Sequence, residues 1–150
     1  QKLSEEGNKA QKGSKRELSD IRTILLSEGL PVETVLSAPI TFFQLVTDTG
    51  ARIGWGGLEI YDNQAVLRSV VIRSALRKTG AGSILVKALI QEAKDVGLKK
   101  IWLLTNNAEN FFEKLGFRHA LRTDAPKAIQ ACEEFTWPHH DVAHCMNMKV

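Results

Sequence analysis

The distribution of apolar and polar positions predicts three strands in residues 40–72, joined as an antiparallel meander. Apolar and β-branched residues dominate these segments, and the turn residues Thr47-Asp48-Thr49-Gly50 and Asp62-Asn63 separate them. The predicted strands span residues 40–46, 52–61 and 65–72.

Helical spacing follows the meander. Apolar residues recur from Gly82 to Val96 in a stripe wide enough to lie flat on a sheet, and Gly97 ends it. A short apolar run at 101–104 predicts a strand covered on both faces, and residues 108–115 predict a short helix. A further strand is expected to begin at Phe117, and a last strand is expected within 143–150. These elements predict the α/β (α+β) class.

The first residues do not share this patterning. Residues 1–18 are almost entirely polar and begin without Met, so we expect a disordered segment or one left by processing or cloning, outside the folded domain at 19–150. Ser19 or Asp20 is expected to begin an amphipathic helix that Gly29 ends.

Composition narrows the classes of protein that remain. The chain has 150 residues, of which 43% are hydrophobic, which suits one compact domain. The net charge of +3 comes from the first sixteen residues and forms no basic patch with aromatics, which argues against nucleic acid. No apolar run reaches the ~20 residues that a bilayer requires. Cys132 and Cys145 occur without a secretion signal, so we expect free thiols and a cytoplasmic protein.

The junction between the third strand and the long helix is the most informative segment. Gly80 and Gly82 let an anion approach the unpaired N–H groups of a helix N-terminus, and Arg77 and Lys78 add positive charge. A P-loop is excluded because it needs Gly-Lys followed by Ser or Thr, whereas Gly82 is followed by Ser83-Ile84. A dinucleotide-binding motif is also excluded, because it would need Gly or Ala at Leu85 and an acidic residue at the end of the next strand, and the sequence has neither.

Two motifs here resemble those of the GNAT acetyltransferase superfamily. Arg77-x-x-Gly80-x-Gly82 is similar to its acetyl-CoA signature, and Ala108-x-x-Phe111-Phe112-x-x-x-Gly116-Phe117 to its second conserved segment. The resemblance covers about residues 20–150 and implies the GNAT fold, which is a mixed, mostly antiparallel twisted sheet with helices on both faces. It also implies a cleft between the strands 65–72 and 101–104, and acetyl-CoA as the acyl donor. The residues it implies for coenzyme binding are Val70, Val71, Ile72, Arg77, Lys78, Thr79, Gly80, Ala81, Gly82, Ser83, Asn107 and Phe111.

Shorter segments look like the subgroup associated with arsenic-resistance gene clusters. They include Gly57-Leu58-Glu59, Leu67-Arg68-Ser69 and Glu134-Phe135. This similarity implies an N-acetyltransferase acting by direct transfer on the amino group of a small, amino-acid-like molecule, as a monomer or a homodimer. The alternative is a catalytically silent acyl-CoA-binding or interaction domain, because Phe112 stands where many members carry a tyrosine that protonates the leaving sulfur.

Catalytic groups are expected along the meander. The resemblance assigns the Val71 N–H to the thioester oxygen. Glu59 is the predicted general base, with a solvated carboxylate or a pair with Arg68 as the alternative. Arg68, with Ser69, is the predicted anchor for a substrate carboxylate, and an intramolecular ion pair is again the alternative.

The late histidines and cysteines match no standard metal spacing. His139, His140, His144, Cys132 and Cys145 are candidate soft-metal or arsenical ligands, which would make the chain a sensor. Their irregular spacing leads us to predict no metal site.

Overall fold

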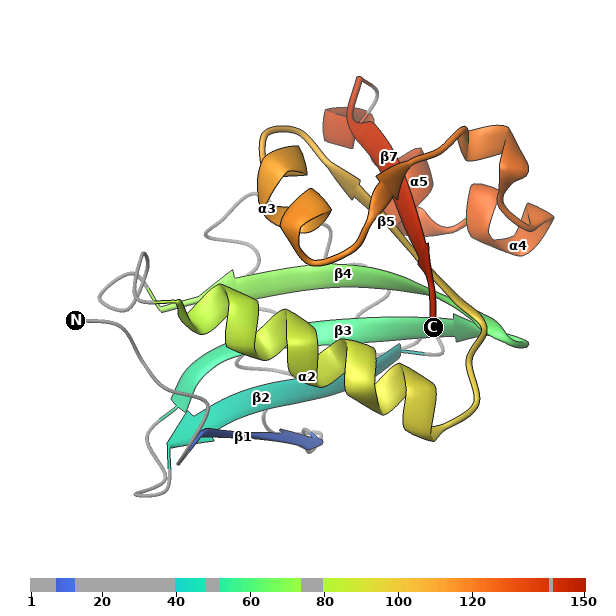
Figure 1. The fold of residues 1–150 in the computed structure, drawn as a ribbon. Coiled ribbons are helices and arrows are strands. Elements are labelled where there is room, and N and C mark those ends of the chain that lie inside the picture. The colour runs from blue at the N-terminus through green and yellow to red at the C-terminus, as the bar shows by residue number, and fades with distance from the viewer. Residues whose placement is uncertain (1–7, 13–39, 48–51, 74–79, 141) are drawn as a thin grey trace.

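In the computed structural model, residues 8–12, 40–47, 52–73, 80–140 and 142–150 are described (Figure 1). The helix predicted to begin at Ser19 or Asp20 lies outside these ranges, as do Arg77, Lys78 and Thr79.

The strands of the described ranges form one seven-stranded mixed sheet in the order β1-β2-β3-β4-β5-β7-β6. Every neighbouring pair is antiparallel except β4 and β5, which are parallel. The strands are β1 (Asn8–Lys12), β2 (Ile40–Thr47), β3 (Arg52–Tyr61), β4 (Gln64–Ile72), β5 (Lys100–Thr105), β6 (Arg118–His119) and β7 (His144–Lys149). The predicted fold class is confirmed.

One strand lies where none was predicted. β1 pairs antiparallel with β2, with Asn8 opposite Thr47 and Lys12 opposite Phe43. This strand lies within the segment 1–18, for which the sequence predicted no strand. Its residues are polar, so the sequence shows no strand pattern there. β1 is an edge strand and, among the described strands, pairs on one side only, and polar side chains are common in edge strands.

Helices cover both faces of the sheet, because successive side chains of a strand point to opposite faces. Ile101 and Leu103 of β5 join a buried cluster with the apolar residues of α2. Trp102 and Leu104 join a second cluster with residues of α4 and α5. The helices are α2 (Ala81–Asp95), α3 (Glu109–Lys114), α4 (Lys127–Gln130) and α5 (Glu133–Thr136), with short 3-10 turns η2 (Arg122–Asp124) and η3 (Pro138–His140).

The helix α2 is the long helix predicted from residue 82, and it lies diagonally across β2, β3 and β4 (Figure 1). No helix among the described residues is long and apolar enough to cross a membrane.

A bulge interrupts β4 where it faces β3. Trp55 is opposite Val71 and Gly57 is opposite Arg68, so two residues of β4 oppose one of β3. Ser69 takes the left-handed conformation at φ 60. Such a bulge bends its strand and re-aims the side chains around it.

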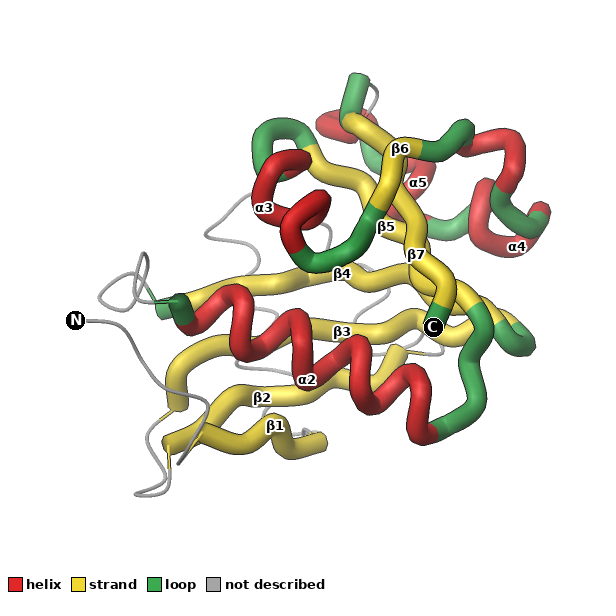
Figure 2. Tube along the Cα trace, in the orientation of Figure 1, coloured by secondary structure: helices red, strands yellow, loops and turns green. Residues whose placement is uncertain are grey.

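The strands β4 and β5 separate beyond this region. They pair only where Gln64, Ala65 and Val66 face residues 100–102, although β4 runs on to Ile72. Figure 2 shows the two strands diverging, with β5 rising toward α3. The predicted separation of these strands therefore forms a split in the middle of the sheet.

Candidate active site

The split between β4 and β5 holds a cleft of about 410 Å³. Its walls come from both strands, from the N-terminus of α2, from the turn before α3, and from α5 and η3. The lining residues are Leu67, Arg68, Ser69, Val70, Gly82, Leu103, Leu104, Thr105, Asn106, Asn107, Ala108, Phe111, Phe112, Glu134 and His140. Because these elements lie on opposite faces of the sheet, the cleft connects the two faces.

The N-terminus of α2 forms one end of the cleft. Gly80 precedes the helix at φ 92, and no side chain of the described residues caps it. The first intrahelical bond runs from the Ile84 N–H to the Gly80 carbonyl at 3.2 Å, so the amides of residues 81–83 have no carbonyl of their own helix. These N–H groups and the helix dipole suit an anion such as a pyrophosphate.

Gly82 keeps this end of the cleft open. A Cβ at this position would meet Phe111 at 3.6 Å and Ile72 at 3.9 Å, which are ordinary contacts. The fold therefore tolerates a side chain here, and the space that glycine leaves is available to a ligand.

The turn between β5 and α3 supplies a second wall. The Ala108 N–H donates to Thr105 Oγ1 at 3.0 Å, which holds the start of α3. Asn107, Phe111 and Phe112 line the cleft, and the rings of Phe111 and Phe112 meet edge to face with centroids 5.0 Å apart. Position 112 therefore faces the cleft with a phenyl ring and no hydroxyl group.

The third wall is the free side of β4. Ser69 and Val70 line the cleft, whereas the Val71 side chain is buried and is not among the lining residues. From Leu67 onward, β5 no longer covers this side of β4 within the described ranges. An extended ligand could therefore lie along the strand, as the resemblance implies for residues 70–72.

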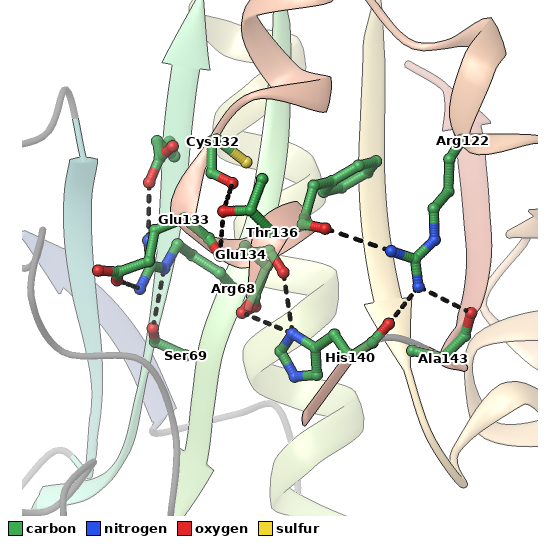
Figure 3. A network of polar contacts seen from close by, with 11 residues as sticks. Arg68, Ser69, Arg122, Cys132, Glu133, Glu134, Thr136, His140 and Ala143 are labelled. Carbon is green, nitrogen blue, oxygen red and sulfur yellow. Dashed lines mark hydrogen bonds and ion pairs between the residues drawn. The ribbon is translucent and has the colours of Figure 1, made fainter. Parts of the chain in front are cut away.

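Arg68 is the centre of a buried ion cluster (Figure 3). Its guanidinium donates to Glu59 Oε1 at 2.9 Å and to Glu133 Oε1 at 3.0 Å, and its Nε donates to Ser69 Oγ at 3.2 Å. Tyr61 also donates its hydroxyl hydrogen to Glu59. Burial alone would lower the pKa of Arg68, but the carboxylates of Glu134, Glu133 and Glu59 raise it above its ordinary value.

These contacts bear on two sequence predictions. Glu59 is 1% exposed, does not line the cleft and is held by Arg68 and Tyr61. Arg68 is 2% exposed and already binds two carboxylates. The geometry thus favours the intramolecular pair over a free base at Glu59 and over a substrate anchor at Arg68. The strand pattern alone could not distinguish an ion pair from a substrate anchor, because one of the carboxylates that binds Arg68, Glu133, lies far away in the sequence.

Glu134 and His140 line the cleft opposite α2, and sequence reasoning did not assign them a role in acyl transfer. Burial raises the pKa of Glu134 to about 7, with Glu59 and Glu133 adding to the rise and Arg68 opposing it. His140 Nδ1 donates to the Glu134 carbonyl oxygen at 2.9 Å. The available signal was the pair of acidic residues, Glu133-Glu134, beside Phe135 in an otherwise apolar segment.

The remaining candidate ligands do not gather into one site. Cys132 and Cys145 are buried free thiols, and burial raises the pKa of each to about 11. His144 pairs with Glu109 at 2.9 Å on the surface. Within the described ranges, no group of three His, Cys, Asp or Glu side chains is arranged to hold a metal ion.

Comparison with known proteins gives a family match. The profile of the Acetyltransferase (GNAT) family matches residues 15–117. The chain is 29% identical to an amino-acid acetyltransferase of Mannheimia succiniciproducens over 94 residues, covering 61% of this chain and 21% of that protein. It is 30% identical to the amino-acid acetyltransferase of Ralstonia nicotianae over 95 residues, covering 62% and 21%. The chain thus spans about a fifth of the length of these curated relatives.

Solved structures share the fold at low sequence identity. N-acetylglutamate synthase from Neisseria gonorrhoeae, complexed with coenzyme A and N-acetyl-glutamate, has a TM-score of 0.74 at 16% identity, over 95% of this chain and 35% of that chain. The ribosomal-protein-S18-alanine N-acetyltransferase from Escherichia coli has a TM-score of 0.71 at 19% identity, over 95% and 94%.

Proposed function

Because the chain belongs to the acetyltransferase (GNAT) family, we propose that it transfers an acetyl group from acetyl-CoA directly to the amino group of a small molecule. The observation that carries this proposal is the cleft through the split sheet, with the N-terminus of α2 at one end and the buried carboxylate of Glu134 at the other. The first end suits the phosphates of acetyl-CoA, and the second suits an amine.

Acetyl-CoA fits the residues that line the donor end. The amides of residues 81–83 would bind the pyrophosphate, and the space at Gly82 would admit it. The pantetheine arm would lie along residues 70–72, with the Val71 N–H meeting the thioester oxygen. Phe112 has no proton to donate, which a thiol leaving group tolerates because its pKa is only about 8.5.

The acceptor is proposed to be a small, amino-acid-like amine. Two curated relatives are amino-acid acetyltransferases, and one structural neighbour was crystallised with N-acetyl-glutamate. The similarity to the arsenic-resistance subgroup suggests toxins such as phosphinothricin or its arsenical counterpart. We also propose a cytoplasmic monomer or homodimer, which fractionation and light scattering would test.

Acetyl-CoA consumption against a panel of amines tests the function. The panel should hold amino acids, amino-acid toxins and polyamines, with release of the CoA thiol as the readout. We expect turnover of at least one primary amine. Tight acetyl-CoA binding without any turnover would favour the silent binding domain, and failure to bind acetyl-CoA would reject the proposal.

A further inference from the structure

Glu134 is a buried carboxylate that faces the cleft without a hydrogen bond on one oxygen. The residue is 5% exposed, and its Oε1 has no hydrogen-bond partner among the described residues. His140 Nδ1 lies 3.5 Å from this oxygen, but its hydrogen points to the Glu134 carbonyl oxygen at 2.9 Å (Figure 3). A buried oxygen left without a donor is costly, which suggests that a ligand supplies the missing donor.

The charges around Glu134 are unbalanced. From the sheet, Arg68 on β4 and Glu59 on β3 face the cluster, and Glu133 is its neighbour on α5. Arg68 therefore meets three carboxylates, and one guanidinium cannot neutralise them all. His140 on η3 approaches from the other side, and the buried thiol of Cys132 stays uncharged because burial raises its pKa to about 11. Among these described side chains the carboxylates outnumber the guanidinium three to one, and this excess of negative charge favours a cation in the cleft.

We propose that Glu134 is the general base of the acetyl transfer and that the acidic cluster around it selects acceptors that arrive as ammonium ions. The inference rests on the proposed function. Glu134 stands on the face of the sheet opposite α2, so its carboxylate meets the acceptor while the donor enters from the other face.

The proton and electron balance is simple. The Glu134 carboxylate accepts one proton from the ammonium group of the acceptor, which frees the nitrogen lone pair. That nitrogen forms a C–N bond with the thioester carbonyl carbon, and the C–S bond breaks with its electron pair on sulfur. The second proton of the nitrogen goes to the departing thiolate. Glu134 then releases its proton to water, so the net products are the amide, the free thiol and one proton.

The raised pKa agrees with this role. A base with a pKa near the working pH combines a useful ionised fraction with useful proton affinity, and burial raises the pKa of Glu134 to about 7. His140 acts as a positioning residue, because its Nδ1–H holds the backbone carbonyl of Glu134.

The test compares Glu134→Gln with Glu133→Gln across about pH 5 to about pH 9. Glu133 carries the same side chain one residue away and adds its charge to the cluster but does not line the cleft, so its variant separates the loss of cluster charge from the loss of the base. With an amine that the wild type acetylates, Glu134→Gln should lower kcat/KM at least ~100-fold at neutral pH and lose the acidic limb of the pH profile. Glu133→Gln should keep that limb but move it to lower pH, because Glu133 raises the pKa of Glu134. Acetyl-CoA affinity should be unchanged. An acidic limb that persists in Glu134→Gln would overturn the proposal.

A second measurement needs no turnover. In wild-type protein labelled with carbon-13 at the glutamate side-chain carboxyl, one NMR signal should titrate near neutral pH and should be absent in Glu134→Gln. Adding methylammonium as a cationic probe should lower the midpoint of that titration, because a nearby cation favours the carboxylate. A signal that titrates in the ordinary glutamate range, or a midpoint that methylammonium leaves unmoved, would reject the base and its cation site. Failure of the proposed function would appear separately: the signal would titrate near neutral pH and respond to methylammonium, but no amine would be acetylated.

Discussion

At the scale of single residues, Arg68 links two segments that are far apart in the chain. It joins Glu59 on β3 to Glu133 on α5, so it ties the second helical layer to the sheet. All three side chains are largely withdrawn from water, with exposures of 0%, 1% and 11%. A buried pair contributes little net stability against an apolar substitute, but removing one partner leaves uncompensated charge.

Arg68→Met should therefore destabilise the fold strongly, by about 3 to 5 kcal/mol, which urea denaturation would measure. The loss should be smaller at about pH 5 than above neutrality, because Arg68 lowers the pKa of Glu134 and its removal lets this carboxyl stay protonated, and therefore uncharged, to a higher pH. The folded pKa of Glu134, about 7, lies above its ordinary 4.5, so the folded protein binds this proton more tightly. Its contribution to stability is complete below 4.5 and disappears as the pH rises to about 7.

Arg73→Met is the control for this measurement. Arg73 is exposed and donates to the Arg52 carbonyl at 3.1 Å, so its replacement should change the free energy of unfolding only slightly. Equal and small losses for both variants would contradict the structural role of Arg68.

Glu59→Gln separates two candidate bases. The Glu59 carboxylate raises the pKa of Glu134, so removing its charge should move the acidic limb of the pH–rate profile to lower pH without abolishing it. If Glu59 were the base, as its place in the strand predicted, the limb would vanish and turnover would fall at least ~100-fold. Initial rates across the pH range, with the same amine, decide between these outcomes.

At the scale of elements, the N-terminus of α2 is the part of the donor site that can be altered with least effect on packing. A Cβ at Gly82 would make only ordinary contacts with Phe111 and Ile72, so Gly82→Val should fold. It should nevertheless obstruct a pyrophosphate at the amides of residues 81–83 and remove most of the thermal stabilisation by acetyl-CoA. That stabilisation is ~2.7 kcal/mol for wild type at ~100 times the dissociation constant.

Lys87→Val places the same β-branched residue on the exposed side of α2. It should lower the melting temperature of the free protein slightly and leave the acetyl-CoA shift intact. A full shift in Gly82→Val would show that the coenzyme does not approach this turn.

The elements that the sequence predicted well are those with enough residues to repeat a pattern. The strands β2 to β5 and the helix α2 agree with prediction to within one or two residues. The turns and short helices between residues 122 and 140 have three or four residues each, which is too few for periodicity to appear. β1 was missed because its residues are polar.

The site was less predictable because long-range geometry builds it. A regular β4 would place residues 67, 69 and 71 on one face, but the bulge at Ser69 puts Leu67, Val70 and Ile72 on the α2 side. The turn at Gly80 and Gly82 could be predicted as a phosphate site from the sequence because its chemistry is local. Glu134 meets Arg68 only after the chain has folded, and no local pattern records that contact.

At the scale of the whole molecule, the split between β4 and β5 opens the sheet between the helical layers on its two faces. α2 and α3 border it on one face, and α5 and η3 border it on the other (Figure 1). Donor and acceptor can therefore occupy the cleft together and meet inside the sheet. This arrangement favours direct transfer, because neither ligand has to leave before the other binds.

Direct transfer makes a kinetic prediction for the protein as a whole. Initial velocities with both substrates varied should give intersecting double-reciprocal lines, and intact-protein mass spectrometry should find no acetylated enzyme after incubation with acetyl-CoA alone.

A covalent route would need a nucleophile such as a thiolate. Cys132 and Cys145 do not line the cleft, and burial raises the pKa of each to about 11, so both remain protonated thiols at neutral pH. Cys132→Ala and Cys145→Ala should therefore retain turnover at wild-type order. Parallel lines, or a stable acetyl adduct that either variant removes, would contradict direct transfer.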